Sequence, residues 1–235
     1  MKNLFRKIVN KILLPYSRLS YAQSGEDIIL ANLFYKLNIQ RPTYLDIGAN
    51  NPNYISNTYY FYLTGSSGVC IEPNPRLCRK FRRVRPRDKV INVGVGIDER
   101  QEADFYLFPP HADGLSTLSK KEADYWGEIG MEGLGKIHYE QVIRIPLKNI
   151  NELIRDNFER CPDFISIDVE GLDLQILKTL NFDAFQPRVL IVETLCYDEK
   201  KKEFKNTDAI EFLQSKGYGV YADTHINSIF LRKEI

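Results

Sequence analysis

The chain has 235 residues, of which 43% are hydrophobic and 27% are charged, the balance of an ordinary globular protein that builds one well-formed core. Its 32 basic and 31 acidic side chains give a net charge of +1, which excludes the strong positive field that draws proteins to nucleic acid. The four cysteines form no C-x-x-C pair, so no zinc knuckle or thioredoxin motif is indicated and we expect a cytoplasmic protein.

Residues 1–20 are predicted to form a basic amphipathic helix, because Lys2, Arg6, Lys7 and Lys11 alternate with apolar residues. The segment has no small-residue cleavage site and no run of roughly 20 apolar residues, so we expect neither a secretory signal nor a membrane span. Two interpretations stay open. The helix either packs on the flank of the domain formed by residues 21–235, or contacts an anionic membrane or a protein partner from the surface.

Strands and helices are predicted to alternate along the rest of the chain. A helix is expected over residues 24–37, with Ser24 as N-cap and Asp27 at the third helical position. Short apolar strands are expected at 43–47, 68–72, 89–95, 163–168 and 188–193, further strands at 105–108 and 142–146, and a closing pair at 218–222 and 228–232. Further helices are expected at 77–84, 172–180 and 208–216, the last ending at Gly217. This alternation predicts an α/β fold with a doubly wound, mostly parallel sheet.

Residues 109–140 do not fit the alternation. They are rich in glycine and contain the single tryptophan and two histidines, His111 and His138. Long irregular segments in compact domains usually carry function, so we interpret this stretch as an insertion that acts as a lid or recognises a substrate.

Carboxylates end several of the predicted core strands: Asp46, Glu72, Asp168 and Glu193. In an open α/β sheet, ligands bind beyond the carboxyl ends of the strands. Glu72 is placed to accept hydrogen bonds from the two hydroxyls of a ribose, and Asp46 to hold the ammonium group of an amino-acid ligand. Gly48 lacks a Cβ, which lets the backbone approach a ligand closely.

Two other nucleotide sites compete for this first loop. A dinucleotide fingerprint needs G-x-G-x-x-G, but Gly48 is followed by Ala49-Asn50-Asn51-Pro52-Asn53, without the second and third glycines. A phosphate-binding Walker loop is excluded because no Gly-Lys-Ser/Thr is present. The plain alternative is that residues 46–48 only end a strand with a turn.

Four segments together resemble the FkbM-family methyltransferases. They are Gln23-Ser24-Gly25-Glu26-Asp27, Leu45-Asp46-Ile47-Gly48-Ala49-Asn50, Cys70-Ile71-Glu72-Pro73-Asn74 and Ile167-Asp168-Val169-Glu170-Gly171. The resemblance extends over residues 21–232. It implies S-adenosylmethionine as cofactor, methyl transfer to hydroxyl oxygens of sugars and other metabolites, and the Rossmann-like class I methyltransferase sheet. That sheet has seven strands, mostly parallel with the last reversed, and helices on both faces.

The resemblance also implies roles for individual residues. Asp46, Gly48 and Asn50 would border the methionine part of the cofactor, Glu72 would hold the ribose, and Asn74 with Val95-Gly96 would approach the adenine. Gln23 and Asp27 would help to close the pocket, or would only cap a helix. Asn57 and Thr58 would assist from the segment after the first loop.

Asp168 and Glu170 are the candidate catalytic residues. Methyl transfer to a hydroxyl needs a positioned oxygen and a group that accepts its proton, and a carboxylate or histidine can serve. The alternative role of Asp168 is to hold the methionine ammonium or to cap the following helix. His225, in the turn before the last predicted strand, is a third candidate because this turn often lies over the pocket in the implied fold.

Asp168 and Glu193 also form a possible site for Mg²⁺ or another divalent cation, since both offer hard oxygen ligands. Thr194 follows Glu193 where a second carboxylate or amide would complete the ligand set. We therefore expect an O-methyltransferase of a glycan or a small hydroxylated metabolite. The alternatives are a cofactor-binding module without turnover and a nucleotide-dependent oxidoreductase.

Overall fold

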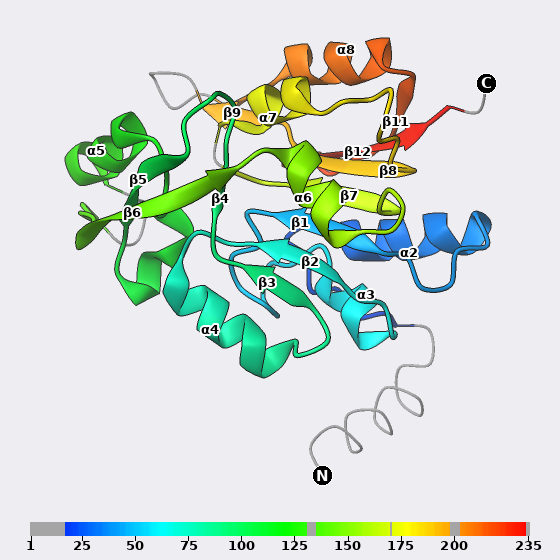
Figure 1. Ribbon diagram of the computed structural model, residues 1–235, viewed down its shortest axis with the longest axis horizontal. Coiled ribbons are helices and arrows are strands. Elements are labelled where there is room, and N and C mark those ends of the chain that lie inside the picture. The colour runs from blue at the N-terminus through cyan, green and yellow to red at the C-terminus, as the bar shows by residue number, and fades with distance from the viewer. Residues whose placement is uncertain (1–16, 131–134, 170, 198–202, 234–235) are drawn as a thin grey trace.

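The computed structural model describes residues 17–130, 135–169, 171–197 and 203–233. Within them, a seven-stranded sheet runs through the centre of the molecule in the order β11-β12-β8-β7-β1-β2-β3 (Figure 1). Its strands are β1 (Tyr44–Ile47), β2 (Gly68–Ile71), β3 (Lys89–Ile91), β7 (Phe164–Ile167), β8 (Val189–Glu193), β11 (Tyr218–Asp223) and β12 (Asn227–Arg232). Five neighbouring strands, β8, β7, β1, β2 and β3, run parallel to one another. Strand β12 runs antiparallel to both β8 and β11. The predicted mostly parallel sheet with a reversed last strand is confirmed.

The central strands are short and apolar because both faces of the sheet are covered. Every residue of β1 and β7 is buried. Side chains alternate between the faces, so Leu45 and Ile47 of β1 point to one core while Tyr44 points to the other.

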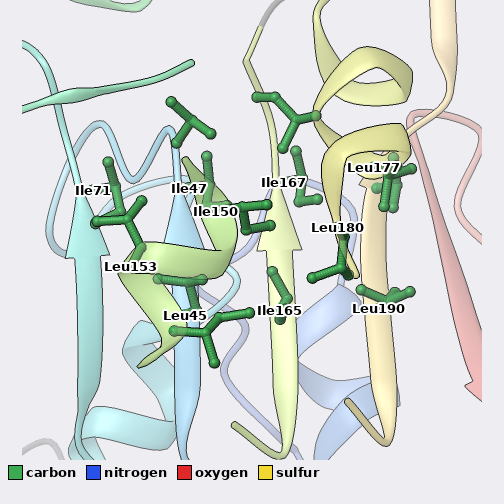
Figure 2. Close-up of a cluster of buried hydrophobic side chains, with 14 of the residues drawn as sticks. Leu45, Ile47, Ile71, Ile150, Leu153, Ile165, Ile167, Leu177, Leu180 and Leu190 are labelled. Atoms are coloured by element: carbon green, nitrogen blue, oxygen red, sulfur yellow. The ribbon is translucent and has the colours of Figure 1, made fainter. Parts of the chain in front are cut away.

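Three helices cover the first face: α6 (Ile150–Asn157), α7 (Asp173–Thr179) and α8 (Thr207–Ser215). Figure 2 shows Ile150 and Leu153 of α6 lying against the side chains of the central strands. The helices α2 (Glu26–Lys36), α3 (Tyr59–Leu63) and α4 (Pro75–Val84) cover the opposite face. The sheet is therefore the middle of three layers, as the alternation of strands and helices predicts.

The insertion is more ordered than expected. It is flanked by β4 (Gly94–Val95), β5 (Glu102–Leu107) and β6 (Gln141–Lys148), which form a separate three-stranded sheet in the order β4-β6-β5. The strands expected at 105–108 and 142–146 correspond to β5 and β6. With these strands, the insertion covers residues 94–148. Between β5 and β6 lie the 3₁₀ helix η1 (Pro110–Leu115) and the helix α5 (Lys120–Ile129), at one end of the molecule in Figure 1. The single strand expected at 89–95 is wrong, because β3 stays in the central sheet while β4 joins the insertion. A small hairpin, β9 (Leu195–Tyr197) with β10 (Glu203–Lys205), follows β8.

Two helix boundaries test the capping signals in the sequence. Gly217 has φ +85° directly after α8, as predicted for a C-terminal glycine. The prediction of Ser24 as N-cap of α2 is wrong: the helix starts after Gly25, and the backbone N–H of Ser24 donates to the Glu26 carboxylate at 2.8 Å. The expected helix at 1–20 lies mostly outside the described residues. No described helix is long and apolar enough to cross a membrane.

The centre of the sheet constrains Gly48, the first residue after β1. Gly48 has φ +76°, and a Cβ built on it would lie 1.8 Å from the backbone carbonyl oxygen of Asp168. The chain beyond β1 therefore passes directly against the chain beyond β7, and no side chain fits between them.

Gly48→Ala is expected to destabilise the protein. The left-handed backbone alone costs about 1–3 kcal/mol in a residue with a Cβ, and the overlap with Asp168 adds to it. Gly217→Ala is the matched control, since it has a similar φ and nothing within 4 Å of the added Cβ. Thermal unfolding should show a clearly larger fall in Tm for Gly48→Ala. Equal falls for the two variants would mean that the close approach to Asp168 does not matter.

Candidate active site

A cavity opens at the carboxyl edge of β1, β2 and β7, where the insertion meets the sheet. Five of the residues singled out from the sequence line it: Gly48, Asn50, Glu72, Val95 and Asp168. The cavity lies where the strand order reverses, which is the expected position of a ligand in an open α/β sheet. The sequence prediction that these segments meet is supported by their shared cavity.

The carboxylate of Glu72 is fixed at the floor of this cavity by two backbone groups. The N–H of Asn50 donates to one oxygen at 2.7 Å, and the N–H of Asn74 donates to the other, also at 2.7 Å. The residue is only 4% exposed. Each oxygen keeps a further lone pair, so the carboxylate can accept two more hydrogen bonds from a ligand.

Burial raises the pKa of Glu72 to about 7, against the opposing effect of the two N–H donors. A ligand that donates hydroxyl groups would favour the ionised form. The site therefore suits a diol, such as the 2′- and 3′-hydroxyls of a ribose.

An apolar wall stands beside Glu72. It is formed by side chains from β2, α4 and the start of the insertion: Ile71, Leu77, Val93, Val95, Phe105 and Leu118. Such a wall can hold a flat aromatic ring next to the polar floor. This combination fits a nucleoside, with the base on the wall and the sugar on the carboxylate.

Asn74 does not line the cavity but fastens the insertion above it. Its side-chain oxygen caps α4 by accepting from the N–H of Arg76, and its amide nitrogen donates to Asp113 at 3.0 Å. The guanidinium of Arg76 also binds Asp113, at 2.9 Å. Asp113 lines the cavity. Sequence reasoning missed both Arg76 and Asp113, because nothing in the sequence shows that η1 folds back over α4.

Asp46 and Thr58 lie behind the first loop rather than in the cavity lining. The hydroxyl of Thr58, which is fully buried, donates to the Asp46 carboxylate at 2.5 Å. Burial raises the pKa of Asp46, and the positive charge of Arg85 opposes this shift. Asn57 reaches the sheet itself and donates to the hydroxyl of Ser166 at 3.1 Å.

Asp168 lines the cavity next to Glu193, the last residue of β8. The two residues follow the paired positions Ile167 and Val192, so they lie side by side at the carboxyl ends of β7 and β8. Burial, followed by the negative charge of Asp46, raises the pKa of Asp168 to about 6, and the neighbouring Glu193 opposes this shift. Asp168 is therefore poised to exchange a proton near neutral pH. Glu170 lies outside the described residues.

Residues 23–27 contact the turn between β11 and β12 through Glu26, a residue that sequence reasoning left without a role. Its buried carboxylate accepts from Thr224 at 2.6 Å and from the side-chain amide of Asn227 at 3.0 Å. Asp27 holds the incoming chain by accepting from Ser20 and from the N–H of Tyr21. Gln23, which was expected near the cofactor, is exposed and is not part of the cavity lining.

The three histidines lie on the surface. His225 is in the turn between β11 and β12, with φ +73°, and its Nε2 lies 2.9 Å from the carboxylate of Glu203. His111 borders a neighbouring hollow, and His138 lies against Gly127 of α5. None of the three lines the cavity. Across the described part of the chain, no three His, Cys, Asp or Glu side chains gather as metal ligands.

Three solved structures with a similar chain path are distant from this chain in sequence. A TehB-like SAM-dependent methyltransferase from Corynebacterium glutamicum is 10% identical, with 98% of this chain and 97% of that chain aligned and a TM-score of 0.44. TehB from Haemophilus influenzae is 10% identical over 91% of this chain and 64% of that one, with a TM-score of 0.49. The O-methyltransferase from Bacillus cereus, in complex with SAH, is 11% identical over 98% and 97%, with a TM-score of 0.46. No curated protein matches the chain.

Residues 46–220 match the methyltransferase FkbM domain, a range that covers most of the chain and runs from the end of β1 to β11. It includes Glu72, Asp168 and the whole insertion between them. The chain thus belongs to the FkbM family of S-adenosylmethionine-dependent methyltransferases.

Proposed function

We propose that this enzyme transfers a methyl group to a hydroxyl oxygen of a glycan or a small hydroxylated metabolite. The observation that carries the proposal is the position of Asp168 in the wall of the cavity, where burial raises the pKa of its carboxyl group. A hydroxyl acceptor needs such a base, since the oxygen must lose its proton when it is methylated.

The residues of the cavity fit S-adenosylmethionine. Glu72 would hold the ribose through its two oxygens, and the apolar wall would hold the adenine. The loop at Gly48 and Asn50 would border the methionine part, which leaves the reacting end near Asp168. When bound, the cofactor supplies an electrophilic methyl group on a positively charged sulfur.

Asp168 would then take the proton of the acceptor hydroxyl through its carboxylate. Glu193 lies at the end of the neighbouring strand and would help to position Asp168. The insertion covers the cavity through Asp113, Gly114 and Thr117, and would exclude water and select the acceptor.

A divalent cation between Asp168 and Glu193 is the alternative way to activate the hydroxyl. The neighbouring position argues against it: the hydroxyl of Thr194 is buried, binds Ser228 at 2.7 Å and accepts from the ammonium of Lys205 at 3.0 Å. The ammonium of Lys205 thus already lies next to Thr194, the position from which a further metal ligand would come. Activity that survives exhaustive chelation would support direct proton transfer to Asp168.

The product of the reaction tests the proposed acceptor class. The enzyme is incubated with cofactor carrying an isotope-labelled methyl group and with panels of sugars, glycosides and hydroxylated small molecules. We expect labelled methyl ethers, which survive mild alkali, whereas methyl esters of carboxylic acids are hydrolysed by it. A labelled product found only on carboxylates or amines would overturn the proposal, and binding without any transfer would favour a cofactor-binding module.

The pH dependence of the rate tests the role of Asp168. Because the base must be ionised, turnover should rise with pH through about 6 and then level off. This rise is the acidic limb of the pH–rate profile. Asp168→Asn should lower the rate by about 10²–10⁴-fold and abolish this limb. Glu193→Gln removes a neighbouring carboxyl group but leaves the carboxylate of Asp168, and should keep the limb.

Asp173 is the other possible source of such a limb, since burial and the charge of Asp168 raise its pKa to about 7. Its carboxylate accepts from the N–H groups of Val169 and Gly171 and has a structural role in the loop. Asp173→Asn should therefore keep the limb. The assignment to Asp168 fails if Asp168→Asn keeps both the rate and the limb.

The affinity for S-adenosylhomocysteine tests the role of Glu72. The ribose hydroxyls need the ionised carboxylate, so affinity should increase as pH rises through about 7 and level off above it. Glu72→Gln should remove this dependence and weaken binding by about tenfold or more, the value of hydrogen bonds to a charged group. Titration calorimetry at pH values on either side of this pKa measures both effects. The exposed Glu99→Gln is the control, and a Glu72→Gln protein that binds like wild type would contradict the assignment.

A further inference from the structure

The loop that follows Gly48 has an unusual backbone. Asn50 and Ile55 both have positive φ, +44° and +49°, and both line the cavity. A β-branched residue such as isoleucine rarely adopts this conformation. It persists only where the surrounding structure holds the chain in place, so some part of the molecule must fix residues 50–58.

Arg85 makes the contacts that can do this. It is the residue directly after α4, is 1% exposed, and directs both terminal nitrogens of its guanidinium at the loop. Nη2 donates to the hydroxyl of Thr58 at 2.9 Å. Nη1 lies 3.4 Å from the carbonyl oxygen of Pro52 and 3.4 Å from the hydroxyl of Ser56. These contacts lie on both sides of Ile55.

The other side of Arg85 is anchored to the body of the domain. Its Nε donates to Asp88 at 2.7 Å, and Nη2 also reaches the hydroxyl of Tyr44 in β1 at 3.1 Å. The ring of Phe81 in α4 lies below the guanidinium, 5.1 Å from its central carbon. The arginine is therefore rigid, and the loop takes its position from β1 and α4.

Thr58 connects this arginine to the first strand-end carboxylate. Its hydroxyl accepts from Arg85 and donates to Asp46. The buried positive charge thus lies between Asp88, which it contacts directly, and Asp46, which it reaches through one hydroxyl. Such a fully bonded network holds one geometry.

We propose that Arg85 is a positioning residue for cofactor binding, which holds the loop of residues 50–58 so that Asn50 and Ile55 form one wall of the cofactor cavity. Arg85 does not line that cavity itself. The inference rests on S-adenosylmethionine occupying the cavity, and wild-type binding of S-adenosylhomocysteine checks that premise separately.

The test compares affinity for S-adenosylhomocysteine with stability, by titration calorimetry on folded protein well below its Tm. Arg85→Lys keeps the charge beside Asp88 but loses the planar fork that reaches several loop groups at once. We expect it to weaken binding tenfold or more. Thr58→Val removes the connecting hydroxyl and should weaken binding similarly, whereas Thr58→Ser keeps the hydroxyl and should restore most of the affinity.

Both changes disrupt the same network. The loss of affinity in the double variant should therefore be smaller than the product of the losses in the two single variants. Arg87→Lys is the matched control, because Arg87 lies over the ring of Tyr62 and makes no contact with the loop. If Arg85→Lys does not fold, the Thr58→Val and Thr58→Ser pair still gives the answer. Variants that lose stability but bind within twofold of wild type would overturn the proposal, and a wild-type protein that does not bind would refute the premise instead.

Discussion

The chain leaves β1 and β7 at one point, where the backbone of Gly48 touches the backbone of Asp168. The N–H of Gly48 donates to Ile71 in β2, and the N–H of Asp168 donates to Ile47 in β1. This contact ties three strand ends together without a side chain between them. The cofactor floor at Glu72 and the base at Asp168 therefore belong to one rigid edge of the sheet, and the distance between them is set by backbone geometry.

The buried carboxyl groups at this edge of the sheet fall into two kinds. Burial raises the pKa values of Glu72, Asp168 and Asp46, but only Glu72 and Asp168 line the cavity. Asp46 instead shares the buried positive charge of Arg85. Glu72 and Asp168 can therefore still bind a ligand or a proton, whereas the carboxylate of Asp46 already has its partners in the protein. This difference separates the residues suited to chemistry from those that hold the loop in shape.

The sequence was sufficient for the central sheet, because short apolar runs that end in a carboxylate are typical of the parallel strands that border a ligand site in an α/β protein. It was not sufficient for contacts made across the chain. Arg85 is one of several arginines in and directly after α4, and only folding shows that it reaches Thr58. The order of the insertion was also underestimated, because its glycines obscured η1 and α5. His225 fitted the implied fold by position, yet its ring pairs with Glu203 on the surface.

A crystal structure of the enzyme with S-adenosylhomocysteine bound would test the central claim most directly. We expect both ribose hydroxyls within hydrogen-bonding distance of the two Glu72 oxygens, the adenine against the apolar wall, and the sulfur on the side of the cavity formed by Asp168. A nucleoside bound with its ribose away from Glu72, or with its sulfur directed away from Asp168, would contradict both the cofactor site and the proposed base.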